Sequence, residues 1–421
     1  MKKYDNLLKL KELLDFSSLP EDNYKHHYFL TPLEVSSLNA KGAFDRLVEG
    51  YVEDSNSKKR GQQQLAEFRW HWACIICGLA QVVFMRSWLI VTLDKNEYGN
   101  KGDFWLGHYG FSYQNLKDII TYLEKEDLVF VKIGKSYLDG SSRTRVYPKP
   151  ALAASIWAFF LDIEQEIKPP YITIKKPAKG WRRVINRMGK DHPEKNDMYI
   201  INEYLKGSSW ACKAPVRLAY KYDAYHSGRL ITPFQSLPDR SIRLRINTLL
   251  NGQPLCEVDF NANHLRLNLA VLAKDAAGDT PYEDIVELAG MDVSNPVSRN
   301  IVKMFITIAM GASDENSAMY AFVKEGYSKK RFISIKKATY VRYPKVMLFN
   351  GWGVMAQSLE GEILRKVMVE GVKLGIASLP VHDALAVNHQ HADWAQEAMA
   401  RVWSDVVGGV GTKLKVDYPT S

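Results

Sequence analysis

Hydrophobic positions in residues 111–148 follow first a helical and then a β periodicity. Ser112 stands where a capping side chain is expected, and four apolar residues then recur on one helix face: Leu116, Ile119, Ile120 and Leu123. Two β-rich runs follow and flank the turn sequence LDGSSR. The pattern therefore predicts a helix followed by a hairpin.

A second apolar stretch, HWACIICGLAQVVF, predicts a buried helix around residues 70–84. Cys74 and Cys77 lie within it, and the chain has four cysteines in all. A zinc site needs further Cys or His ligands at suitable spacing, and a redox pair needs a thioredoxin-like context; neither is visible. Both cysteines are therefore expected to be buried in the helix. A further amphipathic helix is predicted over residues 150–168.

Two β-rich runs in the C-terminal half each deliver an aspartate to the end of a strand. Residues 255–260 form the first run, which ends on Asp259 and continues into an apolar helix. The second run, GIASLPVHDALAVNH, places His382 and Asp383 between two short strands, as in a hairpin. A lone aspartate at a strand end is usually a cap or turn residue. Two aspartates that converge in one sheet, however, can hold the ions of two-metal phosphoryl transfer, and Mg²⁺ suits carboxylate ligands.

A pair of cations lies between these aspartates in the sequence. Arg299 and Lys303 are four residues apart and share one face of a predicted helix. Two cations there can neutralise a triphosphate and assist the departure of pyrophosphate. The apolar residues of the opposite face are expected to be buried: Val302, Phe305, Ile306 and Ala309.

Five segments of the chain resemble, in order, motifs of the family A DNA polymerases. VDFNANHLRLNLAVLA is similar to motif A, RNIVK to the start of motif B on the fingers helix, and LPVHDALAV to motif C with its His-Asp pair. HSGRLITPFQSLP resembles the Gly-Arg-Leu segment before motif A, and GVMAQSLEGEIL resembles the palm helix that carries a template-strand glutamine. Each motif alone is weak, but their common order over about residues 220–390, nearly half of the chain, is specific.

The resemblance implies a right-hand polymerase core, in which palm strands carry Asp259 and Asp383 and the fingers are inserted between them. It implies that both aspartates bind metal, with the Phe260 carbonyl as a third ligand, and that Arg299 and Lys303 bind the triphosphate. Primer–template contacts are implied for Arg229, Gln357 and His382. The implied cofactors are two Mg²⁺ ions, with Mn²⁺ as an alternative, and the implied partners are a DNA primer–template and nucleoside triphosphates.

Three positions depart from the family pattern. The family's DNA enzymes place Glu five residues after the first aspartate, where it packs against the sugar and excludes a 2′-hydroxyl; here that residue is His264. Their fingers helix carries Tyr-Gly at a fixed distance from the lysine, whereas this chain has Met310-Gly311 one residue early or Gly311-Ala312 in register. Ala384 replaces the acidic residue after His-Asp, somewhat as in single-subunit phage-type RNA polymerases. His264, Met310 and Gly311 join the expected nucleotide-binding residues, and the choice between dNTP and rNTP stays open.

An excess of basic residues favours a polyanionic partner. The chain has 56 Lys and Arg against 47 Asp and Glu, a formal net charge of +9. Residues 171–190 contain seven basic residues and no acidic one, a composition suited to duplex phosphates. The expected contacts there are Lys175, Lys176, Arg182 and Arg183. A second cationic cluster over residues 329–345 is expected to line the template path, with a plain solvated surface as the alternative for both.

The helix and hairpin predicted within residues 111–148 resemble the second half of a winged-helix domain, whose helix enters the major groove and whose wing contacts phosphates. DNA contacts on the wing are expected from Lys135, Arg143 and Arg145. The alternatives are a structural or protein-binding winged helix, or no such domain.

Two other groups of ligand-type side chains are expected to be solvated. Asp162 and Glu164 form an Asp-x-Glu pair like the one that opens proofreading exonuclease sites. They lie too close to the polymerase-like motifs for such a domain, and neighbouring acids on a helix usually form a solvated face. His389 and His391 lie in a predicted surface turn. We therefore expect no proofreading.

We expect an α+β protein in three parts: a helical and winged-helix-like module over residues 1–150, a basic connector or reduced thumb over residues 151–220, and a palm over residues 221–421 with fingers at about 280–350. The expected activity is extension of a primer 3′ end, in the replication of a plasmid, phage or mobile element, with origin DNA bound by the winged helix. Two alternatives remain: a primase or RNA polymerase with relaxed sugar selection, and a DNA-binding replication initiator with an inactive palm.

A cytoplasmic location is expected, without a membrane partner. The N-terminal residues lack the apolar core of a secretion signal, and no stretch approaches the about 20 apolar residues of a membrane span.

Overall fold

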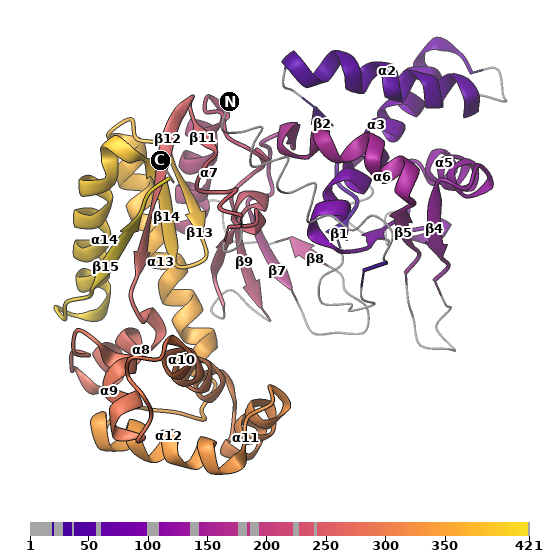
Figure 1. Cartoon of the computed structure of the whole chain (residues 1–421). Coiled ribbons are helices and arrows are strands. Elements are labelled where there is room, and N and C mark those ends of the chain that lie inside the picture. Colours follow the sequence, from indigo (N-terminus) through magenta and orange to yellow (C-terminus); the bar gives the residue numbers. More distant parts are fainter. Residues whose placement is uncertain are drawn as a thin grey trace.

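The structure is a computed structural model of mixed α and β architecture (Figure 1). It describes residues 19–20, 28–35, 38–55, 60–98, 109–134, 143–175, 183–185, 193–221, 227–239 and 242–419. Most strand pairs are antiparallel, whereas β1–β3 and β7–β9 are parallel. The α+β expectation agrees with this arrangement.

The N-terminal region surrounds a long central helix, α3 (Gln62–Met85), and a four-stranded sheet of order β1-β3-β5-β4. Its other elements are β1 (Tyr28–Phe29), β2 (Glu34–Val35), α2 (Leu38–Ser55), β3 (Leu89–Ile90), η2 (Lys95–Tyr98), α5 (Tyr113–Lys125), β4 (Val129–Lys132), β5 (Arg145–Pro148), α6 (Pro150–Ile156), η4 (Trp157–Asp162) and β6 (Ile163–Glu164). One hydrophobic core joins them and extends from Leu30 to Ile163, past the boundary predicted at residue 150.

Helix α3 is buried as the sequence predicted. Cys74 and Cys77 are free thiols and fully buried within it. By length and composition alone, α3 is long and apolar enough to cross a membrane, which the sequence analysis did not expect of any stretch; its most apolar window is 78% buried inside the protein, as in a core helix.

The helix and hairpin predicted from residues 111–148 are confirmed as α5, β4 and β5. The Ser112 hydroxyl caps α5 by accepting a hydrogen bond from the Asn115 amide. The strands β4 and β5 pair antiparallel, and β5 also pairs with β3. The hairpin is thus part of a four-stranded sheet, and the winged-helix identity of this module stays a prediction.

The helix predicted over residues 150–168 is wrong in its second half. Helix α6 ends at Ile156, the 3₁₀ turn η4 follows, and Ile163 then pairs with Val35 in the short strand pair β6–β2. Pairing with β2 supplies the backbone hydrogen bonds that a continued helix would otherwise make.

A second four-stranded sheet, of order β10-β9-β7-β8, follows along the chain. Its region contains β7 (Ile172–Lys175), β8 (Arg183–Ile185), α7 (Pro193–Lys206), β9 (Arg217–Lys221), β10 (Arg229–Ile231) and η5 (Pro233–Ser236). Helix α7 packs against α13 of the C-terminal region.

The C-terminal sheet has the order β11-β12-β14-β13, with β15 on the other side of β12. Its strands are β11 (Leu249–Leu250), β12 (Gln253–Phe260), β13 (Ser378–Val381), β14 (Ala384–Asn388) and β15 (Leu414–Asp417). Helices α13 (Trp352–Lys373) and α14 (Ala392–Val407) pack beside it, and η7 (His389–His391) precedes α14. The predicted strand ending at Asp259 and the predicted hairpin around Asp383 are both confirmed.

A group of helices lies in the chain between β12 and α13 and gathers at one end of this sheet (Figure 1). Its members are α8 (Asn263–Asn268), the π-helical turn η6 (Leu269–Ala273), α9 (Pro281–Leu288), α10 (Pro296–Gly311), α11 (Glu315–Lys324) and α12 (Lys329–Arg342). The α10 stripe predicted to be buried is at most 1% exposed at Val302, Phe305, Ile306 and Ala309. One core joins this group to the sheet and reaches Phe160, which stacks on Phe84 of α3.

Candidate active site

Asp259 and Asp383 lie on neighbouring strands of the C-terminal sheet. β12 pairs antiparallel with β14, and its register places Asp259 opposite Ala384, the residue after Asp383. His382 and Asp383 form the two-residue turn between β13 and β14, and His382 takes a φ of 56° there. The structure therefore brings together the two predicted metal ligands, which are far apart in the sequence.

The carboxyl group of Asp383 sits in an environment that disfavours its charge. Burial raises its pKa most, the negative charges of Glu360 and Asp259 raise it further, and the pKa reaches about 7. Buried carboxylates that lie close together repel one another, and this repulsion is relieved by protonation of one of them or by a bound cation. Such a place suits a cation.

His264 lies in the same cluster, held by a buried carboxylate. Its Nε2 is 2.9 Å from Oε1 of Glu360, which also accepts a 2.9 Å hydrogen bond from the Asn263 amide. Burial acts to lower the pKa of His264, but the hydrogen bond and charge of Glu360, together with Asp383, outweigh it, so that the pKa is raised. The side-chain oxygen Oδ1 of Asn263 in turn accepts a hydrogen bond from the indole N–H of Trp403. Buried groups thus fix the imidazole at the edge of the site.

The segment before β10, which leads into Arg229, docks on α13 at Gln357 and Ser358. The Ser227 hydroxyl donates to Oε1 of Gln357 at 2.6 Å, and the Gly228 amide donates to the Ser358 hydroxyl at 3.3 Å. A Cβ on Gly361 would lie 1.6 Å from the Gly228 carbonyl oxygen, so only glycine allows this approach. The contact holds Arg229 close enough for its charge to act on His264.

The predicted triphosphate ligands lie on α10 with different partners. Arg299 donates from Nε to Oε1 of Glu283 at 2.6 Å, and its guanidinium lies 5.3 Å from the ring centroid of Tyr282. Lys303 is exposed one turn further along the helix. Met310 is fully buried, so the expectation that it contacts a nucleotide does not hold in this conformation; its side chain belongs to the core. Gly311, the last residue of α10, is exposed.

A lysine that the sequence analysis did not single out contacts the first aspartate. Lys415 of β15 lies opposite Asp259 in the strand register, and its Nζ is 2.9 Å from the aspartate Oδ2. No sequence signal marks this lysine, because the pairing of β15 with β12 is a long-range contact. Glu360 was also missed, although its place three residues after Gln357 puts the two on one face of α13.

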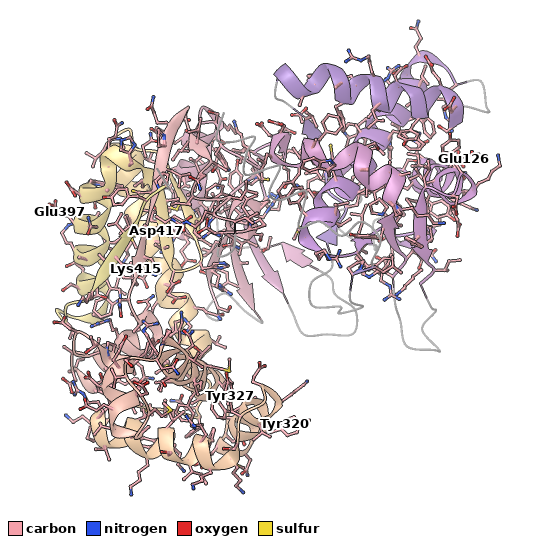
Figure 2. All side chains as sticks on the ribbon, viewed as in Figure 1. Glu126, Tyr320, Tyr327, Glu397, Lys415 and Asp417 are labelled. Atoms are coloured by element: carbon pink, nitrogen blue, oxygen red, sulfur yellow. The ribbon has the colours of Figure 1, made fainter. Side chains whose placement is uncertain are left out.

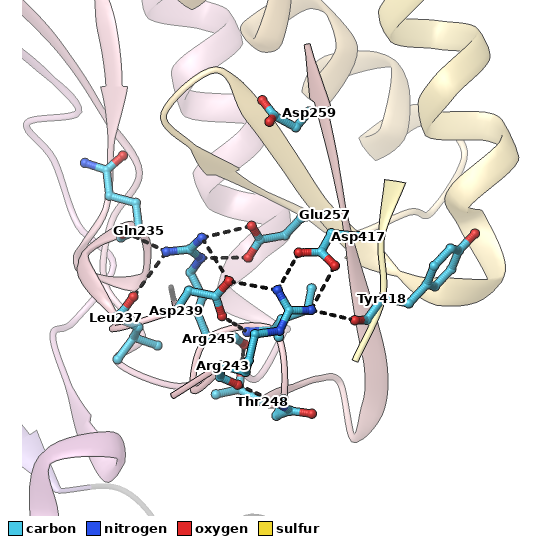
Figure 3. A network of polar contacts seen from close by, with 12 residues as sticks. Gln235, Leu237, Asp239, Arg243, Arg245, Thr248, Glu257, Asp259, Asp417 and Tyr418 are labelled. Atoms are coloured by element: carbon cyan, nitrogen blue, oxygen red, sulfur yellow. Dashed lines mark hydrogen bonds and ion pairs between the residues drawn. The ribbon is translucent and has the colours of Figure 1, made fainter. Parts of the chain in front are cut away.

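A separate polar network fastens the loop before β11 to β12 and β15 (Figure 3). Arg245 makes paired hydrogen bonds of 2.6 and 2.9 Å to Glu257, and Arg243 makes paired bonds of 2.6 and 2.8 Å to Asp417. Glu257 is 6% exposed and lies two residues before Asp259 on β12. The network therefore steadies the strand that presents the aspartate without involving Asp259 itself.

The other residues predicted to bind metal or DNA differ in how far the structure describes them. Phe260 ends β12 with its side chain buried, and His382 is exposed. Arg143 is half-buried, but Arg145 is only 7% exposed, which does not fit the predicted phosphate contact on the wing. Lys135, Lys176 and Arg182 lie outside the described residues; Lys175 and Arg183 are described in their backbone only.

Strand register nevertheless groups basic positions in the second sheet. Lys175 of β7 pairs with Arg183 of β8 on one side and with Lys221 of β9 on the other. This arrangement agrees with a phosphate-binding role, which stays a prediction.

The donor set of the aspartate cluster suits a divalent, oxygen-seeking ion. Asp259 and Asp383 supply carboxylate oxygens, and the ammonium group of Lys415 contacts the first of them. Within the described ranges, no group of three or more His, Cys, Asp or Glu side chains is arranged around a single metal position. His389 is exposed and donates to the Pro254 carbonyl, in line with the predicted surface turn.

No protein-family model and no curated protein matches the chain. Among solved structures, the chain is similar to the POL domain of Pol1 from M. smegmatis in complex with DNA primer-template and dNTP, with 13% sequence identity and a TM-score of 0.34. The similarity covers 89% of this chain and 64% of that one, so this chain spans less than two thirds of the matched protein's length. A TM-score of this size does not assign a shared fold.

Proposed function

We propose that the chain is a template-directed nucleotidyltransferase that extends a primer 3′ end with nucleoside triphosphates. The observation that supports this most strongly is the pairing of β12 with β14, which brings Asp259 next to Asp383. The polymerase-like motifs around these residues, found in family order, give the pair its proposed chemistry. Two metal-binding carboxylates on adjacent strands are what in-line phosphoryl transfer requires.

In the proposed reaction, the primer 3′-oxygen attacks the α-phosphorus of the nucleotide. The bond from the 3′-oxygen to the α-phosphorus forms while the bond from that phosphorus to the α–β bridging oxygen breaks. Pyrophosphate leaves with the electron pair of the broken bond, and the hydroxyl proton passes to water. One Mg²⁺ ion would lower the pKa of the attacking hydroxyl, and both ions would stabilise the developing charge. Asp259 and Asp383 would hold these ions. A bound cation would lie nearer to Asp383 than the carboxylates that raise its pKa, so the pKa of Asp383 would fall.

Arg299 and Lys303 would bind the triphosphate after a local exchange of partners. Arg299 is held by Glu283, and its side chain is 36% exposed. A pair this exposed is worth little in water, about 1 kcal/mol or less, so a triphosphate with several negative charges can displace Glu283. Arg229 and Gln357 would then contact the primer–template beside the metal site.

Ribonucleotide addition is a second candidate, favoured by one observation. His264 stands where the resembled DNA enzymes place a sugar-excluding Glu, and it is tied to Glu360. An imidazole held in this position presents a different surface to the 2′-carbon from that of a carboxylate.

Extension of a labelled primer–template separates the candidates. Purified protein is incubated with Mg²⁺ or Mn²⁺ and either dNTPs or rNTPs, beside reactions with unprimed template. Elongation with dNTPs is the expected result. Faster elongation with rNTPs, or synthesis on unprimed template, would favour the primase or RNA polymerase alternative. Duplex binding without elongation under any condition would leave only the DNA-binding initiator.

A further inference from the structure

Lys415 faces the same side of the sheet as the first aspartate. The two residues are directly opposed in the β12–β15 register, and the ammonium nitrogen is 2.9 Å from Oδ2 of Asp259. Directly opposed residues of an antiparallel pair present their side chains to one face. Figure 2 labels Lys415 and Asp417 along β15, the strand that delivers this lysine.

The local charges explain why a cation is held there. Asp383 lies close enough to both Asp259 and Glu360 for their negative charges to act on it, and His264 lies close enough to Glu360, Asp383 and Arg229 for their charges to act on it. Among the described residues, Lys415 is the ion-pair partner of Asp259. Its ammonium therefore lowers the electrostatic cost of holding the carboxylates together.

The ion pair between Lys415 and Asp259 is exposed enough to be broken readily. The Lys415 side chain is 64% exposed, whereas that of Asp259 is 28% exposed. An exposed lysine on a flexible four-carbon stem is weakly held by its partner. A hard divalent ion that binds the Asp259 carboxylate competes with the ammonium, because the two cations share one carboxylate and repel each other at this short range.

We propose that Lys415 is an internal counter-ion that neutralises Asp259 in the metal-free protein and competes with the metal ion for it. The inference rests on the proposed function, since it takes Asp259 as a metal ligand. Its consequence is specific: loss of the lysine charge strengthens metal binding at this site instead of weakening it. A lysine with only a structural role would not have this effect.

The direct test measures Mn²⁺ binding to the full chain by electron paramagnetic resonance, without DNA or nucleotide. Lys415→Met is expected to bind Mn²⁺ more tightly than the wild type, by up to about fivefold, the range of an exposed ion pair. Lys415→Arg keeps the charge and is expected to stay near the wild type.

Lys413→Met is the matched control. Lys413 lies two residues away and pairs with Asp279 at 3.4 Å, so this variant removes the same charge without touching Asp259. Its affinity is expected to stay close to that of the wild type. If Lys413→Met and Lys415→Met raise the Mn²⁺ affinity equally, the gain comes from the net charge of the protein and not from the contact with Asp259, and the inference is overturned.

Asp259→Ala distinguishes failure of this inference from failure of the proposed function. If Asp259→Ala loses Mn²⁺ binding while Lys415→Met is unchanged or weaker, the counter-ion role is wrong and the metal site stands. If Asp259→Ala binds as tightly as the wild type, Asp259 is not a metal ligand, and both conclusions fall.

Discussion

At the scale of single residues, three acids and one imidazole determine the chemistry of the site. Asp383 has its pKa raised by burial and by the charges of Glu360 and Asp259, while Glu360 raises the pKa of His264. Glu360 is 6% exposed and comes from α13, a different element from the one that carries His264. One buried carboxylate therefore influences both the proposed metal ligand Asp383 and His264.

The first prediction concerns Glu360. Glu360→Gln keeps the side-chain shape but removes the charge, so the pKa of His264 is expected to fall. Two-dimensional NMR of the histidine ring protons over a pH titration measures this directly. Glu362→Gln is the matched control, because Glu362 lies on the same helix and pairs with Lys366 on its exposed side. A His264 pKa that stays the same in Glu360→Gln would contradict the hydrogen-bonded pair.

The second prediction concerns pH and the stability of the metal-free protein. The pKa of Asp383 is raised from 3.8 to about 7 in the folded protein, so the fold binds the proton of this carboxyl more tightly than the unfolded chain does. The contribution of Asp383 to the free energy of unfolding is therefore fully present below about pH 4 and is lost as the pH rises through about 7. The melting temperature of the wild type, relative to Asp383→Asn, should therefore fall between about pH 4 and pH 8. A difference that grows with pH over this range would mean that the carboxylate is stabilised in the fold.

At the scale of elements, close packing between α13 and the segment before β10 aligns the site. Gly361 meets the Gly228 carbonyl, and the neighbouring side chains Gln357 and Ser358 bond to the same segment. This contact connects the position of Arg229 to a helix that also carries Glu360.

The third prediction tests this packing. Gly361→Ala places a Cβ against backbone that cannot move aside as a side chain would, and it should destabilise the protein by about 1–3 kcal/mol or more. Gly50→Ala is the control: Gly50 lies in helix α2 with nothing within 4 Å of an added Cβ, and alanine there should stabilise by up to about 1 kcal/mol. Urea denaturation measures both. Equal effects of the two variants would contradict the close approach.

The elements of the site were largely predictable from the sequence, whereas its cross-strand contacts were not. Local periodicity identified β12, the β13–β14 hairpin and α10, because each is a short segment with its own pattern. Lys415 escaped detection because its role depends on the register between β15 and β12, which no local pattern encodes. Met310 lies four residues after Ile306, on the side of α10 predicted to be buried, so helical spacing already disfavoured the nucleotide contact that the family resemblance suggested.

At the scale of the whole molecule, basic positions extend beyond the aspartate cluster. Lys175, Arg183 and Lys221 occupy neighbouring register positions across β8, β7 and β9. The N-terminal region forms a hydrophobic core of its own around α3. A role for this region in DNA recognition stays a prediction from the winged-helix resemblance, and residues 135–142 lie outside the described residues.

The fourth prediction concerns these basic positions. Replacing Lys175 and Arg183 with Gln should weaken duplex binding and reduce the slope of log affinity against log salt by up to about 2, close to one for each lost phosphate contact. Fluorescence anisotropy at several salt concentrations measures the slope. Lys206→Gln, which removes a lysine paired with Glu203 on α7, should leave it unchanged. An unaltered slope in the double variant would exclude phosphate contact by this sheet.

The most direct test of the proposed chemistry is the rate at which single-aspartate variants extend a labelled primer–template with Mg²⁺. Asp259→Ala and Asp383→Ala should each lower the rate by roughly a thousandfold or more, since a metal ion contributes several kcal/mol to the transition state, while duplex binding stays nearly intact. Asp279→Ala, at an aspartate whose side chain is 88% exposed, should extend like the wild type. Extension by either active-site variant at the wild-type rate would contradict the two-metal assignment.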